Sequence, residues 1–206
     1  MQMRKQLLLS FLCGVALPLV LMGMVGKVSP DAGESESDGL SGLAQSSWDS
    51  ETRILVLFDS GNVRQMTMGE YLCGVVLAEM PADFEEEALK AQAVVARTYT
   101  CKRMEHNKHG TAALCTDSGC CQGYRDSDDY VNSGGSVQSV EKICSAVTET
   151  DGQVLVYGGE LIDATYFSCS GGQTEDAVAV WGQDVPYLRS VESPGEENAP
   201  PFTDTV

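Results

Sequence analysis

The chain has 206 residues, of which 30 are acidic and 13 are basic, and its formal net charge is −17. That length allows about one domain of ordinary size once an N-terminal apolar stretch and a polar segment are set aside. The charge has the wrong sign for a protein that neutralises phosphate groups, so the composition argues against nucleic acid as a partner.

Residues 1–27 have the pattern of a membrane anchor. Arg4 and Lys5 precede about 20 mostly apolar residues, a length that can span a bilayer, and Lys27 closes the stretch. The run is longer than the core of a typical signal peptide and no clear cleavage site follows it, so we expect a retained anchor. Because basic residues precede the span, the rest of the chain is expected outside the cytoplasm, as in a single-pass protein of the cell membrane.

A polar segment follows the predicted anchor. Residues 28–52 are rich in Ser, Asp, Glu and Gly and have too little apolar surface to fold alone. We interpret them as an acidic flexible tether. The folded domain is expected over residues 53–206, and it opens with a β-prone run from Ile54 to Phe58.

Two helices are predicted next, each from a capping pattern. Thr67 and Glu70 have the spacing of a capping box, and an apolar stripe behind them runs to Glu79. Asp83 and Glu86 repeat that spacing, and apolar residues at helical intervals follow them. We therefore expect a first helix that ends near Glu79 and a longer one that begins at Asp83.

The remaining segments are less regular. Residues 106–135 show no periodicity and are rich in Gly, Ser and Asp, which predicts a long functional loop. A helix is expected over 137–147, and strands over 153–157 and 161–167 flank a Gly-Gly turn as in a hairpin. Together these elements predict an α+β fold.

Glu79 is the first candidate for acid chemistry. Leu72, Val76 and Glu79 are spaced i, i+4 and i+7, so they project from nearly the same side of the helix. Desolvation there would raise the pKa of Glu79, as a general acid near neutral pH requires. A helix-terminal glutamate turned to solvent, or paired with an arginine, is the alternative, and position alone favours that alternative.

Arg97 lies on the longer helix among Ala and Val residues. A guanidinium buried there would need a carboxylate partner. From spacing, Arg97 could pair with Glu79, hold a substrate or lie on the surface.

The irregular loop contains residues suited to binding metal. His109, Cys115 and Cys121 are each separated by five residues, and thiolate with imidazole is a ligand set that zinc prefers. A metal would also replace the core that such a loop lacks. Cys120 and His106 are rival ligands, and a disulfide or a set of free thiols is the alternative.

The SCSGGQT turn, residues 168–174, follows the last predicted strand. It offers backbone donors to a sugar chain, and we count Ser170 among the candidate substrate-binding residues. The chain has two histidines and neither is near these serines in sequence, so a Ser-His-Asp triad is not expected.

Three longer segments carry a resemblance to a known family. They are YLCGVVLAEMPADFEEEALKAQAVVARTY, the Cys-rich CTDSGCCQGY and ATYFSCSGGQTEDAVAVWGQDVPYLRSVESP. Together they resemble lytic transglycosylases of the SpoIID/LytB type, and the resemblance spans residues 53–194. It implies a SpoIID-like catalytic domain with a zinc-bearing loop.

The resemblance implies roles for individual residues. Glu79, in the EMP motif, would be the catalytic acid, and Arg97 and Tyr187 would contact substrate. Arg189 would also contact substrate, although it replaces the lysine of the motif, so a planar guanidinium stands where a compact ammonium is expected. Zinc, with a structural role, would be held by His109, Cys115 and Cys121.

The implied activity is cleavage of the bond between N-acetylmuramic acid and N-acetylglucosamine in peptidoglycan. Glu79 would protonate the glycosidic oxygen and then accept the proton of the muramoyl 6-hydroxyl, which leaves a 1,6-anhydro end. The family context implies septal wall degradation during engulfment in sporulation. Expected partners are glycan strands, the membrane, a cell-wall amidase and a membrane protein of the engulfment machinery.

The alternative function is a non-catalytic glycan-binding or amidase-enhancing module. Family members also continue into a segment with a GHGVGMSQ-like motif, which the sequence does not contain before Val206. We therefore expect the C-terminal part of the domain to be missing.

Overall fold

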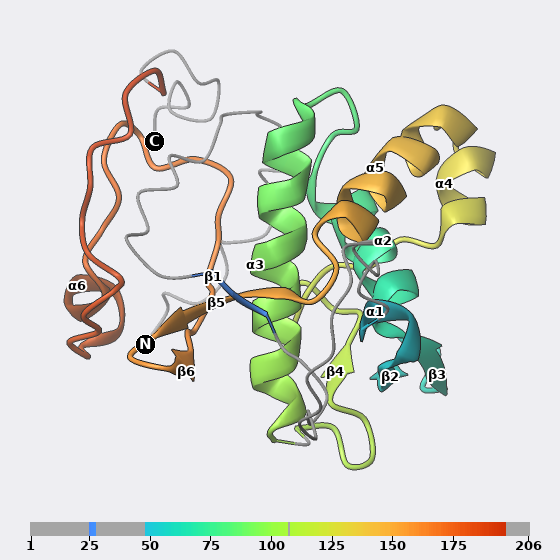
Figure 1. Cartoon of the computed structure of the whole chain (residues 1–206), viewed down its shortest axis with the longest axis horizontal. Coiled ribbons are helices and arrows are strands. Elements are labelled where there is room, and N and C mark those ends of the chain that lie inside the picture. Colours follow the sequence, from blue (N-terminus) through green and yellow to red (C-terminus); the bar gives the residue numbers. More distant parts are fainter. Residues whose placement is uncertain (1–24, 28–47, 107, 197–206) are drawn as a thin grey trace, which may run out of the picture. The chain divides into compact units, whose positions relative to one another are not determined.

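The computed structural model of the protein describes residues 25–27, 48–106 and 108–196 (Figure 1). They fall into two compact units, a first that ends at Thr165 and a second that begins at Tyr166. Helices and strands both occur, so the expected α+β class is confirmed.

The first unit contains most of the regular structure. Its helices are α1 (Trp48–Glu51), α2 (Met68–Glu79), α3 (Glu86–Met104), α4 (Ser127–Asn132) and α5 (Val137–Glu149). Its strands are β1 (Val25–Lys27), β2 (Arg53–Leu57), β3 (Val63–Thr67), β4 (Leu114–Cys115), β5 (Gln153–Tyr157) and β6 (Glu160–Leu161). The second unit has one short helix among its described residues, α6 (Ala177–Trp181).

The strands form two small sheets. In one, β2 lies between β3, its antiparallel neighbour, and β4, which runs parallel to it. The parallel register pairs Leu57 with Cys115, so the chain enters the Cys-rich loop from the edge of this sheet. In the other sheet β5 lies between β1 and β6, and both neighbours are antiparallel to it.

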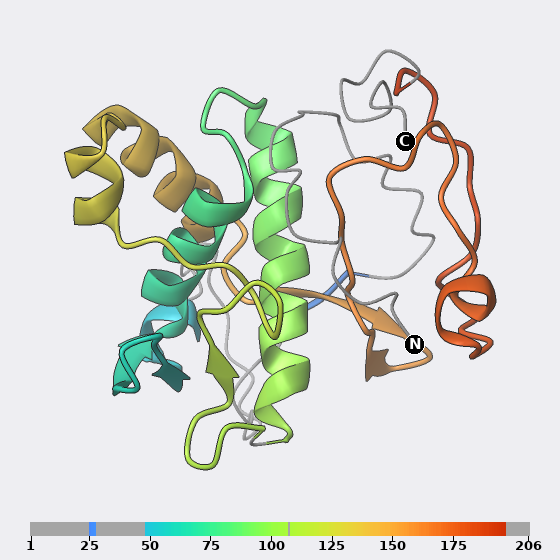
Figure 2. The same ribbon diagram turned by 180° about the vertical axis from the view of Figure 1, so that it is seen from behind.

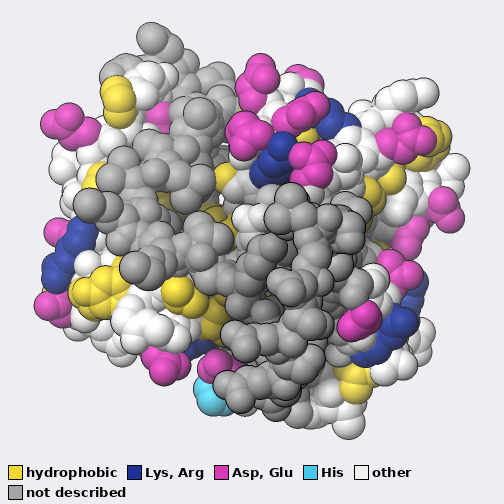
Figure 3. Space-filling model, in the orientation of Figure 1, with side chains coloured by type: hydrophobic (Ala, Val, Ile, Leu, Met, Phe, Trp, Pro, Cys, Tyr) yellow, Lys and Arg dark blue, Asp and Glu magenta, His cyan; other side chains and the backbone are white. Residues whose placement is uncertain are grey.

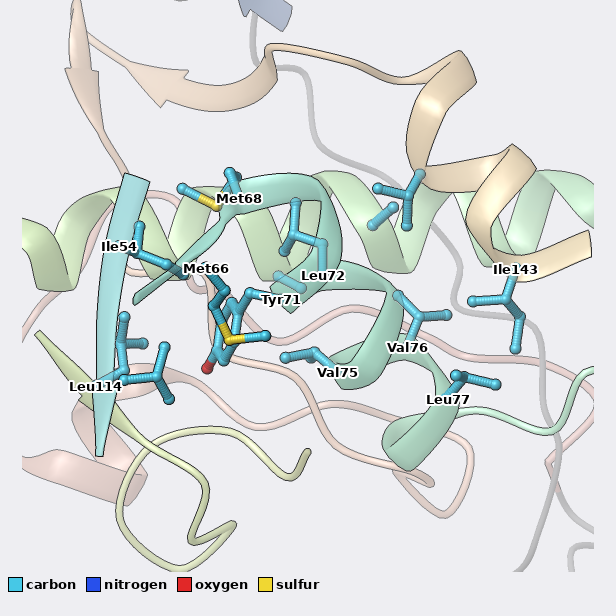
Figure 4. Close-up of a cluster of buried hydrophobic side chains, with 14 of the residues drawn as sticks. Ile54, Met66, Met68, Tyr71, Leu72, Val75, Val76, Leu77, Leu114 and Ile143 are labelled. Carbon is cyan, nitrogen blue, oxygen red and sulfur yellow. The ribbon is translucent and has the colours of Figure 1, made fainter. Parts of the chain in front are cut away.

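The core of the first unit is built around α2. Residues such as Leu72, Val75 and Val76 are fully buried, and Figure 4 shows α2 side chains between Ile54 of β2 and Ile143 of α5. Burial of each such side chain contributes about 1.5–3 kcal/mol relative to exposure. In Figure 1 the long helix α3 runs through the unit with α2 and α5 on one side of it.

The capping prediction is confirmed for α2 and wrong for α3. Thr67 Oγ1 accepts a hydrogen bond from the N–H of Glu70, and Glu70 Oε2 accepts one from the N–H of Thr67. In contrast, α3 begins at Glu86 and its N-cap residue, Glu85, makes no side-chain capping bond. The chain before it forms a turn in which the N–H of Phe84 donates to the carbonyl of Pro81, so Asp83 lies in the turn and does not cap the helix.

The N-terminal predictions fall mostly outside the described residues, which include neither 1–24 nor 28–47. Where the anchor was expected to end, Val25–Lys27 form β1 and pair with β5. Trp48–Glu51, assigned to the tether, form α1, so the folded part begins before Arg53. None of the helices that the structure describes has the length and hydrophobicity needed to span a bilayer.

The predicted loop and hairpin are partly confirmed. The loop over 106–135 contains β4 and α4, which its sequence did not indicate. The expected helix exists as α5, and β5 pairs with β6 as a hairpin, but β6 ends at Leu161 instead of Phe167. Strand β3 was not predicted, because its sequence VRQMT lacks apolar alternation. The structure agrees with this pattern, since three successive residues of the strand are exposed.

A buried ion pair joins four elements of the first unit. Arg97 of α3 is 0% exposed, and its Nε and Nη2 donate to the two carboxylate oxygens of Asp49 at 2.9 and 2.6 Å. The guanidinium also donates to the carbonyl of Val147 in α5 and to that of Gln153 in β5. Burial raises the pKa of Asp49, an effect that the Arg97 hydrogen bond and charge oppose.

Ion pairs on the surface are exposed to water, unlike the buried pair of Arg97 and Asp49. Figure 3 shows acidic side chains spread over one face of the molecule with basic ones among them. Lys90, for example, lies 2.9 Å from Glu87 and 2.7 Å from Glu149. Water screens such pairs, which contribute about 0–1 kcal/mol each.

We predict that Asp49→Ala destabilises the protein strongly, because it leaves the Arg97 guanidinium buried without a counter-charge. The free energy of unfolding should fall by about 3–5 kcal/mol. Chemical denaturation measures this change, with Glu87→Ala as the control that removes an exposed partner of Lys90 and should cost at most about 1 kcal/mol. Equal effects of the two substitutions would contradict the assignment.

Candidate functional site

Glu79 is the last residue of α2 and lies at the edge of the core. Leu72 and Val76, on the same side of the helix, are fully buried, whereas Glu79 is half-buried. The sequence therefore placed Glu79 correctly beside an apolar face, and the structure adds that its side chain retains access to solvent. A carboxyl in this position can contact a substrate on its exposed side, whereas the core closes its other side.

The turn that follows Glu79 is held by the neighbouring helix α5. Met80 leaves the helix in an extended conformation, and its N–H donates to the carbonyl of Val76 at 3.0 Å. Lys142 of α5 then donates from Nζ to the carbonyl oxygens of Ala82 at 3.0 Å and Phe84 at 2.6 Å. Charge-assisted bonds of this kind hold the turn against the fraying that is common at helix ends.

A segment of the Cys-rich loop lies along α2, and we call residues 120–125 the strap (Figure 2). The N–H of Arg125 donates to the carbonyl of Gly74 at 3.0 Å. The ring of Tyr124 stacks on that of Tyr71, with centroids 6.0 Å apart, and occupies the space where Gly74 has no side chain. A Cβ at position 74 would lie 2.2 Å from this ring, so the strap can approach α2 only because of the glycine.

The strap is also held from within. Gln122 is 1% exposed, and its side-chain amide donates to the hydroxyl of Tyr71 in α2 and to that of Thr100 in α3. Both bonds come from the amide nitrogen, and because a buried N–H group is costly to leave without a hydrogen bond, they hold the residue in this position.

The strap contacts Glu79 directly through Gly123. The backbone N–H of Gly123 donates to Glu79 Oε1 at 2.8 Å. The residue has no side chain in the way, whereas a Cβ there would lie 2.9 Å from that oxygen. Sequence analysis missed Gly123, although it lies in the CTDSGCCQGY motif, because its partner is 44 positions away in the chain.

The His/Cys cluster lies just before the strap. The ligand atoms of His109, Cys115, Cys120 and Cys121 all lie within 4.8 Å of one another, so these residues could hold a metal ion. His109 Nε2 lies 3.4 Å from Cys121 Sγ and 3.7 Å from Cys120 Sγ. Cys120, a rival ligand in the sequence, thus joins the predicted three, whereas His106 is exposed and outside the cluster.

The donor set fits a tetrahedral metal site. Zn–S and Zn–N bonds of ordinary length put neighbouring ligand atoms roughly 3–4 Å apart, and the two sulfur–nitrogen distances of the cluster lie in that range. Burial raises the pKa of the Cys115 thiol to about 12, and a hydrogen bond from Lys108 lowers that of Cys120. Thiol ligands bind as thiolates, so a bound cation would favour the charged form of both.

Arg97 does not have the expected role. It was predicted to contact substrate, or to pair with a carboxylate if buried, and its carboxylate partner is Asp49 instead of Glu79. The guanidinium is 0% exposed and cannot reach a ligand in solution. Arg97 is therefore a structural residue. Sequence analysis did not identify Asp49 as its partner, because Asp49 was assigned to the tether.

Ser170 lies in the second unit, where its donors are directed at Glu196. Its N–H and its hydroxyl both donate to Glu196 Oε2, and the hydroxyl of Ser193 donates to Oε1 at 2.7 Å. Burial of Glu196 favours the neutral form, but hydrogen bonds from Ser170, Ser193 and the N–H of Gly172 outweigh it and lower the pKa to about 2. In this structure Ser170 organises its own loop.

Tyr187 and Arg189 also belong to the second unit. Tyr187 is half-buried. Arg189 is exposed, and its guanidinium lies 2.6 Å from Asp184 and 4.0 Å from Asp176. Their predicted contact with substrate stays a prediction.

Comparison with known proteins finds a family model that matches part of the chain. Residues 59–157 match the family model described as SpoIID, stage II sporulation protein. Glu79 and the His/Cys cluster lie inside this match, whereas Ser170, Tyr187 and Arg189 lie beyond it. The resemblance recognised in the sequence motifs is confirmed.

Individual relatives give the same result. Stage II sporulation protein D of Bacillus amyloliquefaciens is 38% identical over 149 residues, which are 70% of this chain and 43% of that protein. The protein of the same name in Bacillus subtilis (strain 168) gives the same values. An amidase enhancer of Bacillus subtilis is 40% identical over 117 residues, 57% of this chain and 14% of that protein. The match with the two sporulation proteins thus spans less than half of their length.

We predict that Ser170→Ala raises the pKa of Glu196 above its value of about 2, because it removes one hydrogen bond to the carboxylate. An NMR titration of the Glu196 side-chain carboxyl carbon measures this. Ser190→Ala, a change in the same unit at a serine that bonds Thr174, should leave the pKa unchanged. Since the folded pKa is depressed, Glu196 stabilises the fold fully above about pH 4.5, and this contribution is lost as the pH falls through about 2. An unchanged titration in Ser170→Ala would contradict the assignment.

Proposed function

We propose, from the membership of residues 59–157 in the SpoIID family, that the chain is a peptidoglycan lytic transglycosylase with Glu79 as its catalytic acid. The observation that carries the proposal is the setting of Glu79. Its carboxyl is half-buried at the end of a core helix and is held at a defined place by the N–H of Gly123. Such pre-organisation is what a group that transfers protons needs.

The proposed reaction uses one carboxylate twice. Protonated Glu79 gives its proton to the glycosidic oxygen as the bond from C1 of N-acetylmuramic acid to that oxygen breaks. The resulting carboxylate accepts the proton of the muramoyl 6-hydroxyl, whose oxygen forms the new bond to C1. The product is a 1,6-anhydro end, and Glu79 is again protonated for the next cycle.

The His/Cys cluster supports a structural zinc site as part of this proposal. Three thiols and one imidazole form a closed ligand set with no position left for water, as in structural zinc sites. Zinc would supply cross-links to a loop that has little core of its own, and it would take no part in the proton transfers. Its ligands Cys120 and Cys121 begin the strap that reaches Glu79.

The biological setting of the proposal follows from the names of the relatives. Sporulation and cell-wall partners are suggested by the stage II sporulation proteins and by the amidase enhancer. We propose that the chain acts on glycan strands in septal wall during engulfment, anchored in the cell membrane with its folded part outside. A partner amidase and a membrane protein of the same machinery complete this proposal.

The similarity to an amidase enhancer favours a second candidate function. A non-catalytic module would bind glycan strands and raise the activity of an amidase without cutting the strands itself. The two candidates differ in one outcome, since only the first releases anhydro-muropeptides from purified glycan.

We predict that Glu79→Gln abolishes the release of anhydro-muropeptides from peptide-free glycan strands. The amide retains the shape and an acceptor for Gly123 but cannot donate and recover the proton, so the rate should fall by about 100-fold or more. Mass spectrometry of the soluble products measures the loss. Glu86→Gln, at an exposed acid in the first turn of α3, should leave the rate unchanged.

Three results decide between the candidates. Products that persist in Glu79→Gln would remove Glu79 from the mechanism. Glycan binding by the unaltered protein without any product would favour the amidase-enhancing module. Equal losses in Glu79→Gln and Glu86→Gln would indicate damage to the fold.

We predict that Cys115→Ser reduces bound zinc, measured by elemental analysis of the purified protein, and lowers the melting temperature. The reason is that a ligand at the edge of the β2–β4 pair is lost, and with it a cross-link of a loop that has little regular structure. Cys144→Ser, at a half-buried thiol of α5 outside the cluster, should retain the metal. Full zinc content in Cys115→Ser would contradict the ligand assignment.

A further inference from the structure

We infer that Gly123 is a positioning residue for Glu79, whose backbone N–H fixes one carboxyl oxygen and thereby assigns the transferred proton to the other. The inference deepens the proposed function, and the effect of Gly123 on catalysis rests on that proposed function. The contact itself, from Gly123 N to Glu79 Oε1 at 2.8 Å, does not.

The chemistry of a carboxyl group gives the contact its meaning. A protonated carboxyl has one O–H donor, and its carbonyl oxygen is the better acceptor. Because the N–H of Gly123 engages Oε1, the protonated form of Glu79 carries its proton on Oε2. The same N–H stabilises the carboxylate that remains after the proton has been given up.

The N–H can direct Glu79 because the strap on both sides of it is fixed. Gln122, the preceding residue, is buried and bonded to α2 and α3. Tyr124, the following residue, is stacked on Tyr71, and the N–H of Arg125 is bonded to the carbonyl of Gly74. The peptide group between these anchors cannot follow a carboxyl that rotates away, so Glu79 has one favoured orientation.

The absence of a side chain at position 123 leaves room for this approach. A Cβ there would lie 2.9 Å from Glu79 Oε1 and 3.5 Å from the Cβ of Ala78. The first distance is shorter than real Cβ contacts, so the carboxyl would have to move. The backbone of Gly123 is in a region open to other residues, since its φ is not among the positive ones, and alanine at 123 therefore disturbs the contact and not the backbone conformation.

The test compares Gly123→Ala with Gly69→Ala in the intact protein. At Gly69, in the first turn of α2, the nearest atom to an added Cβ is 3.6 Å away, an ordinary contact. We expect Gly123→Ala to lower kcat for release of anhydro-muropeptides by about 10–100-fold with little change in KM, because the acid is displaced and the glycan contacts are not. Gly69→Ala should match the unaltered protein.

A spectroscopic measurement tests the contact without any activity. In isotopically labelled protein, a scalar coupling across the hydrogen bond should join the Gly123 amide nitrogen to the Glu79 side-chain carboxyl carbon. The coupling should disappear in Gly123→Ala and persist in Gly69→Ala. If the unaltered protein lacks this coupling, the inference is overturned. This result does not depend on whether Gly123→Ala folds.

The outcomes separate this inference from the proposed function. If the unaltered protein shows the coupling but releases no anhydro-muropeptides, the proposed function fails and the positioning contact stands. If the protein is active and Gly123→Ala has an unchanged kcat, the positioning role is wrong and the proposed function stands. If Gly123→Ala and Gly69→Ala raise KM and lower kcat by the same factors, the positioning role is also wrong.

Discussion

The packing of the strap against α2 is the constraint on which the candidate site depends. Tyr124 fits where Gly74 has no side chain, and this fit sets the distance between the Cys-rich loop and the helix that carries Glu79. At that distance the N–H of Gly123 reaches the carboxyl. The same segment begins at two residues of the His/Cys cluster, so one short stretch of chain connects a potential metal site to the proposed acid.

The Arg97–Asp49 pair fixes how the helices of the first unit pack against one another. An apolar core is tolerant of small shifts between helices, whereas a buried guanidinium with fixed acceptors on α1, α5 and β5 is not. Desolvation of both charges offsets much of their attraction, and burial indeed raises the pKa of Asp49. The pair therefore specifies how α3 meets its neighbours more than it adds net stability.

Local signals in the sequence predicted local structure well. The capping box of Thr67 and Glu70 and the apolar stripe behind it identified α2, and turn chemistry identified the β5–β6 hairpin. Contacts that join distant parts of the chain had no such signal. Asp49 pairs with a residue 48 positions away and Gly123 with one 44 positions away, and neither spacing has a period that sequence analysis can recognise. Glu79 and the cluster were found because their residue types suggest chemistry, whereas Gly123 acts through its backbone and carries no such mark.

In the proposed reaction, Glu79 promotes an internal attack by the muramoyl 6-hydroxyl and not an attack by water. Digestion of glycan strands in water enriched in oxygen-18, followed by mass spectrometry of the product ends, tests this most directly. We expect 1,6-anhydro ends without the heavy isotope, because the bond that breaks and the bond that forms both lie within the substrate. Reducing ends that carry oxygen-18 would show hydrolysis and contradict it.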